Sequence, residues 1–252
     1  MPMMQTNGAG AGDGAAIEVS GIARRFGHRW ALRGVSLRVE PGEVAALIGH
    51  NGSGKTTLLR VISTAIRPTR GTGRIFGFDL VRDAHRIREL LGVLGHSPGL
   101  YGDLTARENL EFAQRMAGAT PDRREIESSL EAVGLEREAE EFVRTFSAGM
   151  QRRLALARLI LRQPRLILLD EPYAAFDADG IERVNALLAR HKATGGAAIV
   201  ATHDLARAEP VVDRVWAIAQ GRLIGEDGQE PPLGHEGSTR ETIGKEGEKA
   251  IR

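Results

Sequence analysis

Cysteine, long apolar runs and a large net charge are all missing from this sequence. Without cysteine, the chain can form neither disulfide bonds nor thiolate metal sites. No stretch approaches the roughly 20 apolar residues that a bilayer-spanning helix needs, and the Gly/Ala-rich start has no apolar core of the signal-peptide type. A formal net charge of +1 provides no strong field to attract nucleic acid or acidic lipid. We therefore expect a soluble, intracellular protein that does not bind nucleic acid.

The order of strand-like and helix-like segments divides the chain into a core and an insertion. A chain of 252 residues can bury a sizeable core, as one domain or as one domain with a large insertion. Residues 17–225 alternate between the two patterns, which predicts an α/β fold with a mostly parallel sheet and helices on both faces. Within them, residues 96–163 show helical patterns and no convincing strand, so we expect a helical insertion. Residues 1–16 are expected to be a flexible leader, and the Gly-, Pro- and Glu-rich residues 226–252 a disordered tail.

The strand boundaries follow from apolar runs and from alternation with a period of two. This alternation predicts strands at residues 17–22 and 35–39. Residues 68–73, with Pro68, Gly71 and Gly73, are typical of a turn that leads into a short strand at 74–76. The remaining predicted strands are residues 44–48, 91–95, 165–169 and 197–201, with a closing hairpin of 215–219 and 223–224.

Capping residues predict where the helices of the insertion begin. Thr105 and Glu108 form a capping box, in which the hydroxyl and the carboxylate accept from N–H groups at the start of a helix. Pro121 is expected at the first position of the next helix, where its missing N–H has no consequence. A third helix should follow Ser147. We expect one face of that helix to carry Met150, Leu154, Ala157 and Leu161, and further helices at 57–62, 83–90 and 181–191.

The segment Gly49–Thr56 has the form G-x-x-x-x-G-K-[ST] between an apolar strand and a helix. Glycines let successive backbone N–H groups surround an anion, and the helix N-terminus adds partial positive charge. Lys55 is expected to reach the β- and γ-phosphates of a nucleoside triphosphate, and the Thr56 hydroxyl to bind Mg²⁺. The alternative is a glycine-rich turn without a ligand, but the strand–loop–helix context favours phosphate binding.

Two carboxylates follow the apolar run Leu166–Leu169. Ligands of parallel sheets bind at the carboxyl ends of the strands, which places Asp170 beside the phosphates. We expect Asp170 to hold Mg²⁺, directly or through water, and Glu171 to polarise a water in line with the γ-phosphate. The alternative is a strand that ends in two solvated acids.

Two further segments are candidates for the functional site only because the chain also contains the phosphate loop. His203 follows the predicted strand 197–201 and is expected to contact the γ-phosphate or orient the water, although a histidine there is more often a satisfied surface or core residue. Ser147 is expected to cap its helix, whose free N–H groups form a second anion site. The alternative for Ser147 is an ordinary helix N-terminus.

Together, these motifs resemble the nucleotide-binding subunit of an ABC transporter. The resemblance covers about residues 17–225 and rests on the phosphate loop, Ser147–Gln151, Asp170-Glu171, Asp177 and His203 in that family's order. It implies the ABC ATPase fold, which is a P-loop NTPase core with an antiparallel β subdomain and an inserted helical subdomain. It also implies ATP hydrolysis with Mg²⁺, a head-to-tail dimer that holds two ATP molecules, and partner subunits that span the membrane. The location implied is cytoplasmic, on the inner face of the cell membrane.

The resemblance assigns roles to individual residues of this chain. Phe26 matches the aromatic that stacks on adenine, with a core aromatic as the alternative. In the signature, usually Leu-Ser-Gly-Gly-Gln, Phe146 replaces Leu, Ala148 replaces the first Gly, and Met150 varies the Gln position. The residues implied to bind nucleotide are Phe26, Gly49, His50, Asn51, Gly52, Ser53, Gly54, Lys55, Thr56, Thr57, Ser147, Gly149 and Gln151. Glu171, His203 and His96 are implied to be catalytic, Thr56 and Asp170 to bind metal, and Asp177 to contact the second copy. His96 stands where the family has glutamine, which puts the coupling of hydrolysis in question.

Short sequence motifs indicate a subgroup of the ABC transporter family. The Leu-Gly-His stretch before Pro-Gly, Phe-Ser-Ala-Gly-x-Gln-Arg-Arg and Leu-Asp-Glu-Pro-Tyr are similar to the ATP-binding subunit of the haem exporter of cytochrome c maturation. Drug and lipid exporters share several of these words and remain an alternative. A soluble ABC ATPase, such as one of Fe–S assembly, is a rival without a membrane partner. A regulator that does not hydrolyse ATP is disfavoured by the presence of Glu171 and His203.

Overall fold

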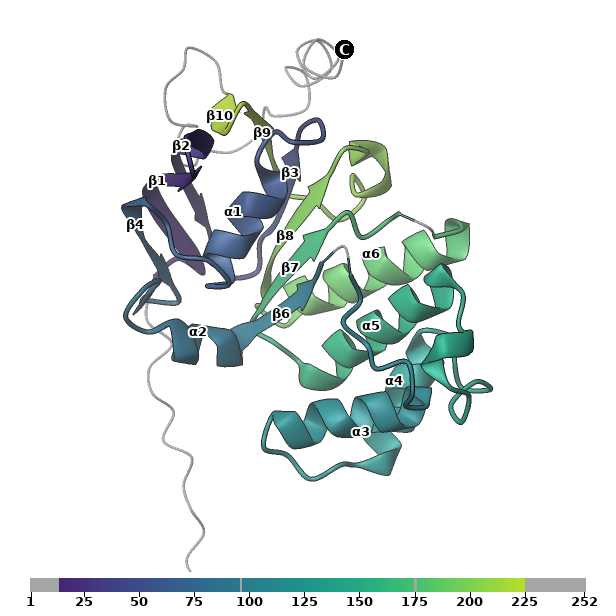
Figure 1. The fold of residues 1–252 in the computed structure, drawn as a ribbon. Helices are drawn as coiled ribbons and strands as arrows, with labels where there is room; N and C mark the ends of the chain where they lie inside the picture. Colours follow the sequence, from purple (N-terminus) through teal and green to yellow (C-terminus); the bar gives the residue numbers. More distant parts are fainter. Residues whose placement is uncertain (1–13, 96, 175, 225–252) are drawn as a thin grey trace, which may run out of the picture.

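An antiparallel sheet forms the first part of the fold. This computed structural model describes residues 14–95, 97–174 and 176–224. The first sheet has the order β2-β1-β4-β5, and each pair of neighbouring strands is antiparallel. Figure 1 labels β2, β1 and β4 of this sheet. The strands are β1 (Ile17–Phe26), β2 (Arg29–Val39), β4 (Arg70–Ile75) and β5 (Phe78–Asp79). This sheet is the antiparallel β subdomain that the family resemblance implies.

The turn predicted at residues 68–73 is wrong, because strand β4 already begins at Arg70. Its glycines serve close packing instead of a turn. A Cβ atom on Gly71 would collide with the backbone of Gly21 in β1, and one on Gly73 would lie 2.8 Å from a methyl group of Val19. Glycine inside a strand often marks such a close approach of another backbone. The predicted strands 17–22 and 35–39 are confirmed, but they are parts of longer strands that form one hairpin.

A six-stranded sheet carries the rest of the fold, in the order β10-β9-β3-β8-β7-β6. All its neighbouring strands are parallel except β10, which pairs with β9 as the predicted hairpin. The mostly parallel sheet is therefore confirmed. Its strands are β3 (Val44–Ile48), β6 (Leu91–Leu94), β7 (Leu166–Asp170), β8 (Ala197–Thr202), β9 (Arg214–Ala219) and β10 (Arg222–Ile224).

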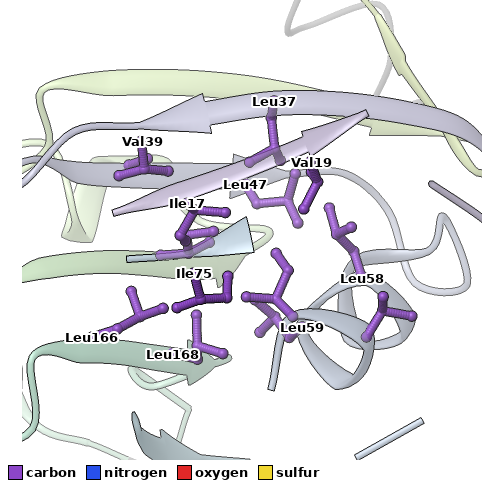
Figure 2. Packing of buried hydrophobic residues seen from close by; sticks show 14 of the residues in the cluster. Ile17, Val19, Leu37, Val39, Leu47, Leu58, Leu59, Ile75, Leu166 and Leu168 are labelled. Atoms are coloured by element: carbon purple, nitrogen blue, oxygen red, sulfur yellow. The ribbon is translucent and has the colours of Figure 1, made fainter. Parts of the chain in front are cut away.

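Alternate residues of the central strands pack into two separate cores. Leu166 and Leu168 of β7 belong to a cluster with α1 (Lys55–Ile62), α2 (Ala84–Leu90) and the antiparallel sheet, and Figure 2 shows part of it. Ile167 and Leu169 point to the other face, against helices α3 to α6. Because both faces are covered, residues 166–169 of β7 form a continuous apolar run, as is typical of parallel sheets. Burial of each such side chain contributes about 1.5–3 kcal/mol.

The helical insertion consists of α3 (Ala106–Met116), α4 (Arg123–Ala132) and α5 (Ala148–Arg162), with the short 3₁₀ turn η1 (Val143–Thr145) before α5. Both bonds of the Thr105–Glu108 capping box are present. The prediction for Pro121 is wrong, because Asp122 caps α4 by accepting from Arg124 N and Glu125 N, which leaves Pro121 outside the helix. Ser147 caps α5 as predicted. Met150 and Leu161 are only half-buried, so the buried face of α5 differs from the predicted one.

The remaining elements are helix α6 (Ala178–Ala193) and the short 3₁₀ turn η2 (Leu205–Arg207). Ala15 and Ala16, at the end of the predicted leader, are buried, and Ala16 O accepts from Phe76 N at 3.0 Å. Residues 1–13 of the predicted leader and the whole predicted tail lie outside the described residues. Within the described ranges, no helix is both long and apolar enough to cross a membrane.

Candidate functional site

The candidate site lies where β3, β8 and β7 end. These strands are neighbours and run parallel, with Ile48 opposite Thr202 and Asp170 opposite Ala201. The loop after β3, the acids at the end of β7 and His203 after β8 therefore meet at one edge of the sheet. This edge is where parallel α/β sheets bind their ligands.

The backbone of the loop Gly49–Thr56 depends on glycine. Gly52 and Gly54 have φ angles of 79° and 122°, which favour a residue without a side chain. A Cβ atom on Gly49 would collide with the carbonyl oxygen of Ile218 in β9. Helix α1 follows directly, with Gly54 as its N-cap. Across the described ranges, no acceptor is found for the backbone N–H groups of Gly52, Gly54, Lys55 and Thr56, which is typical of an anion-binding loop.

Lys55 links the loop to the acid pair. Its buried ammonium group donates to Gly49 O at 2.5 Å and to His50 O at 3.4 Å. The same nitrogen lies 3.4 Å from Glu171 Oε1. Glu171 Oε2 is in turn 2.8 Å from His203 Nδ1. Lysine, glutamate and histidine from three parts of the chain therefore form one continuous row of polar contacts.

Thr56 and Asp170 provide a pair of hard oxygen donors. The Thr56 hydroxyl donates to Asp170 Oδ2 at 2.7 Å, and Asp170 is buried. Mg²⁺ binds proteins through one or two such oxygens and takes its other ligands from water and phosphate. The donor set therefore fits Mg²⁺ bound together with a phosphate chain.

The charged residues of the loop and of the segment after it, up to Arg74, are all positive. No acidic residue occurs between Glu43 and Asp79, a segment that contains Lys55 and four arginines, Arg60, Arg67, Arg70 and Arg74. Such a distribution favours the approach of a polyanionic ligand. This pattern is visible in the sequence and supports the interpretation of the loop.

Phe26 ends β1 with 48% of its surface exposed, so the alternative of a core aromatic is wrong. The Arg24 guanidinium lies 4.6 Å from the centre of its ring and is held by a hydrogen bond to Arg67 O. With the guanidinium over one face, the exposed ring can stack on a planar group with the other face.

A model of the ABC transporter family matches residues 32–174, which is more than half of the chain. The chain is an ATP-binding subunit of the ABC transporter family. It is 40% identical to the cytochrome c biogenesis ATP-binding export protein CcmA 2 of Cupriavidus metallidurans over 205 residues, which are 79% of this chain and 94% of that protein. It is 37% identical to the daunorubicin resistance ATP-binding protein DrrA3 of Streptomyces coeruleorubidus over 213 residues, which are 84% of this chain and 67% of that protein.

Solved structures agree with this assignment. The ATP-binding cassette MJ0796, in a dimeric post-hydrolysis state bound to ADP and phosphate, matches with a TM-score of 0.77 and 27% identity. The match covers 87% of this chain and 100% of that one. The predicted ABC ATPase fold is confirmed, and the activity of the chain is ATP hydrolysis.

The signature segment of this ABC subunit makes only local bonds among the described residues. Ser147 is exposed, and its hydroxyl accepts from Met150 N at 3.2 Å. Gln151 Nε2 donates to Phe146 O at 3.3 Å. Neither side chain is hydrogen-bonded to the phosphate loop of the same chain.

Two predicted site residues remain, Asp177 and His96. Asp177 is exposed and caps α6 by accepting from Gly180 N at 2.9 Å, so it has a local structural function besides any contact with a second copy. His96 lies outside the described residues.

One buried residue of the site was missed by the sequence analysis. Arg152 of α5 donates to the backbone carbonyls of Asp170 and Glu171 at 3.3 and 2.5 Å. Its sequence signal is weak, because Arg152-Arg153 in an amphipathic helix looks like a pair of solvated charges. Only the tertiary packing places Arg152 on the buried face of α5.

Proposed function

We propose that this chain binds ATP with Mg²⁺ at the edge formed by β3, β7 and β8, and that its hydrolysis drives an exporter whose membrane-spanning subunits are separate chains. The observation that carries the proposal is the row Lys55–Glu171–His203 beside the Thr56–Asp170 pair. In this arrangement the cation Lys55, the base Glu171 and the metal-binding oxygens of Thr56 and Asp170 would all lie beside the same phosphate chain. The nucleotide-binding set is Phe26, Gly49–Thr57, Ser147, Gly149 and Gln151.

In this proposal, the loop N–H groups and Lys55 bind the β- and γ-phosphates. Glu171 Oε1 is buried and, among the described residues, accepts no hydrogen bond, so it can accept one from the attacking water. His203 uses Nδ1 for Glu171 and keeps Nε2 for the γ-phosphate or the water. His96 assists from the position where the family has glutamine.

Thr56 and Asp170 would hold Mg²⁺ in this site. When bound, the ion neutralises charge on the β- and γ-phosphate oxygens. The hydrogen bond between Thr56 and Asp170 supports this role, since it holds the two oxygen atoms 2.7 Å apart, close enough to bind one ion together.

A second copy of the chain completes the site. Ser147 is exposed at the N-terminus of the 15-residue helix α5, and its bonds within the chain are local. A head-to-tail dimer would bring this end of α5 to the γ-phosphate held by Lys55 of the other copy. Asp177, exposed at the start of α6, would contact the second copy in the same arrangement.

The membrane-spanning partner is expected to bind the surface formed by residues 98–104 and 140–145. These segments are joined by hydrogen bonds from Val143 N to Leu104 O and from Arg144 N to Gly102 O. They expose two aromatic side chains, Tyr101 at 53% and Phe142 at 42%. Exposed aromatic residues held by backbone pairing are typical anchors of protein interfaces. We place the chain on the cytoplasmic side of the cell membrane, bound to that partner.

Replacing Phe26 by Ala is expected to raise the Kd for ATP about tenfold, since stacking on an aromatic ring contributes about 1–3 kcal/mol per base. The turnover number at saturating ATP should change less than about twofold, because the ring is remote from the γ-phosphate. Phe26→Tyr should restore affinity, and Phe142→Ala is the matched control at another exposed ring. Unchanged ATP affinity in Phe26→Ala would refute the adenine contact.

Haem export for cytochrome c maturation is the transport function that we favour. The cytochrome c relative is aligned over 94% of its length at 40% identity, against 67% at 37% for the daunorubicin relative. Export of a drug or lipid is the second candidate, supported by the daunorubicin relative.

The test is to delete the gene of this chain and to measure covalently bound haem in c-type cytochromes. We expect that haem to be lost, and to return when the chain is supplied again but not when Glu171→Gln is supplied. The tagged chain should also purify with the multi-span proteins encoded beside it. Normal c-type cytochromes together with drug sensitivity would favour the second candidate. The absence of any membrane partner would favour a soluble ABC ATPase of the Fe–S assembly type.

A further inference from the structure

Arg152 is a buried cation in contact with the backbone of the acid pair. Only 8% of its surface is exposed. Its Nη2 donates to Glu171 O at 2.5 Å and to Asp170 O at 3.3 Å, while Nε has no acceptor among the described residues. Burial lowers the pKa of this guanidinium, and the nearby carboxylates of Asp170 and Glu171 oppose that shift. Burying a charged group is unfavourable unless specific partners compensate for the lost water.

The backbone that Arg152 contacts has an unusual conformation. Glu171 has a φ angle of 51°, in the left-handed region that residues other than glycine rarely adopt. Such a conformation persists only where surrounding contacts enforce it. Here the Glu171 N–H donates to Ala201 O at 2.8 Å, and the Glu171 carbonyl accepts from Arg152 and, at 3.3 Å, from Ala174 N.

This backbone conformation directs the Glu171 side chain. Its two oxygens reach Lys55 at 3.4 Å and His203 at 2.8 Å, and a rotation of the backbone at this residue would move both. Of the groups that fix the Glu171 carbonyl, the Arg152 guanidinium is the only charged one among the described residues. Hydrogen bonds from a charged donor are about twice as strong as neutral ones.

We propose that Arg152 is a positioning residue for the general base Glu171. Through its guanidinium, helix α5 holds the peptide group of Glu171 in the orientation that aims the carboxylate at the attacking water. Arg152 lies little more than one helical turn after Ser147. Its hydrogen bond to Glu171 O therefore links the N-terminus of α5, where the signature segment begins, to Glu171 of the same chain. This inference rests on the proposed function of Glu171 and adds the residue that maintains its geometry.

The test uses Arg152→Met, which keeps much of the side-chain volume and removes the donors. We expect its kcat for ATP to fall about 10- to 100-fold while the Kd for ATP changes less than about threefold, because the base and not the phosphate loop is disturbed. The matched control is Arg153→Met. Arg153 is the next residue of the same helix, and its guanidinium donates to Gly134 O at 3.2 Å in the insertion. Both variants should lower the melting temperature, but only Arg152→Met should lower kcat.

A double variant separates positioning from general destabilisation. If Arg152 acts through the Glu171 carboxylate, Arg152→Met combined with Glu171→Gln should be no more than about twofold slower than Glu171→Gln alone. Multiplicative losses in the double variant, or a kcat of Arg152→Met within about twofold of wild type, would overturn the inference. Should Arg152→Met not fold, the same comparison is made with Arg152→Gln. Wild-type turnover of Glu171→Gln alone would instead overturn the proposed function of Glu171, so the two failures are distinguishable.

Discussion

Substituting Lys55 by Ala is expected to weaken ATP binding at least about a hundredfold, because hydrogen bonds to a charged group contribute about 1.5–3 kcal/mol each and Lys55 is proposed to make more than one to the phosphates. The ammonium group is already in place at the loop, held by Gly49 O and His50 O. Binding therefore requires little rearrangement of this side chain. The affinity is measured by equilibrium titration with a fluorescent ATP analogue.

The same substitution also changes the protein without nucleotide. It removes the cation 3.4 Å from Glu171 Oε1 and leaves a cavity in a buried position, so a lower melting temperature is expected as well. Lys192→Ala is the matched control, since Lys192 pairs with Asp213 away from the phosphate loop. Wild-type affinity for ATP in folded Lys55→Ala would refute the assignment of the loop.

Glu171→Gln is expected to bind ATP within about threefold of wild type and to hydrolyse it at least tenfold more slowly, since general bases contribute about 10²–10⁴ in rate. The amide keeps the shape of the carboxylate and can still accept from His203, but it cannot take a proton from water. Single-turnover hydrolysis of labelled ATP measures the chemical step directly.

A consequence for assembly follows from the slow hydrolysis. With ATP bound and not consumed, Glu171→Gln should accumulate as a dimer, which light scattering with and without ATP detects. The conservative change Glu182→Gln, at an exposed acid of α6, should leave both turnover and assembly unchanged. Wild-type turnover in Glu171→Gln would remove this residue from the mechanism and require another base.

Predictions from local patterns succeeded where neighbouring residues decide the structure. The capping box of Thr105 depends on contacts within a few residues, and the apolar run Val44–Ile48 marks a buried strand by composition alone; the structure confirms both. Predictions failed where contacts with a distant segment of the chain determine the local conformation. Residues 68–73 look like a turn by composition, but Gly71 and Gly73 are small because β1 packs closely against them. Proline is common at the first position of a helix, which favours Pro121 there, but the carboxylate of Asp122 caps the helix and leaves Pro121 outside it.

By itself, the sequence determined the phosphate loop Gly49–Thr56 and the acid pair Asp170-Glu171, because each motif relies on spacing within one strand–turn unit. The order of the motifs along the chain determined the family. Only the tertiary structure decided how they combine. The 3.4 Å contact between Lys55 and Glu171 depends on the strand order β3-β8-β7, which no local pattern specifies. The burial of Arg152 depends on which face of α5 packs against the sheet, since a helix with charges and apolar residues on several sides leaves that choice to packing.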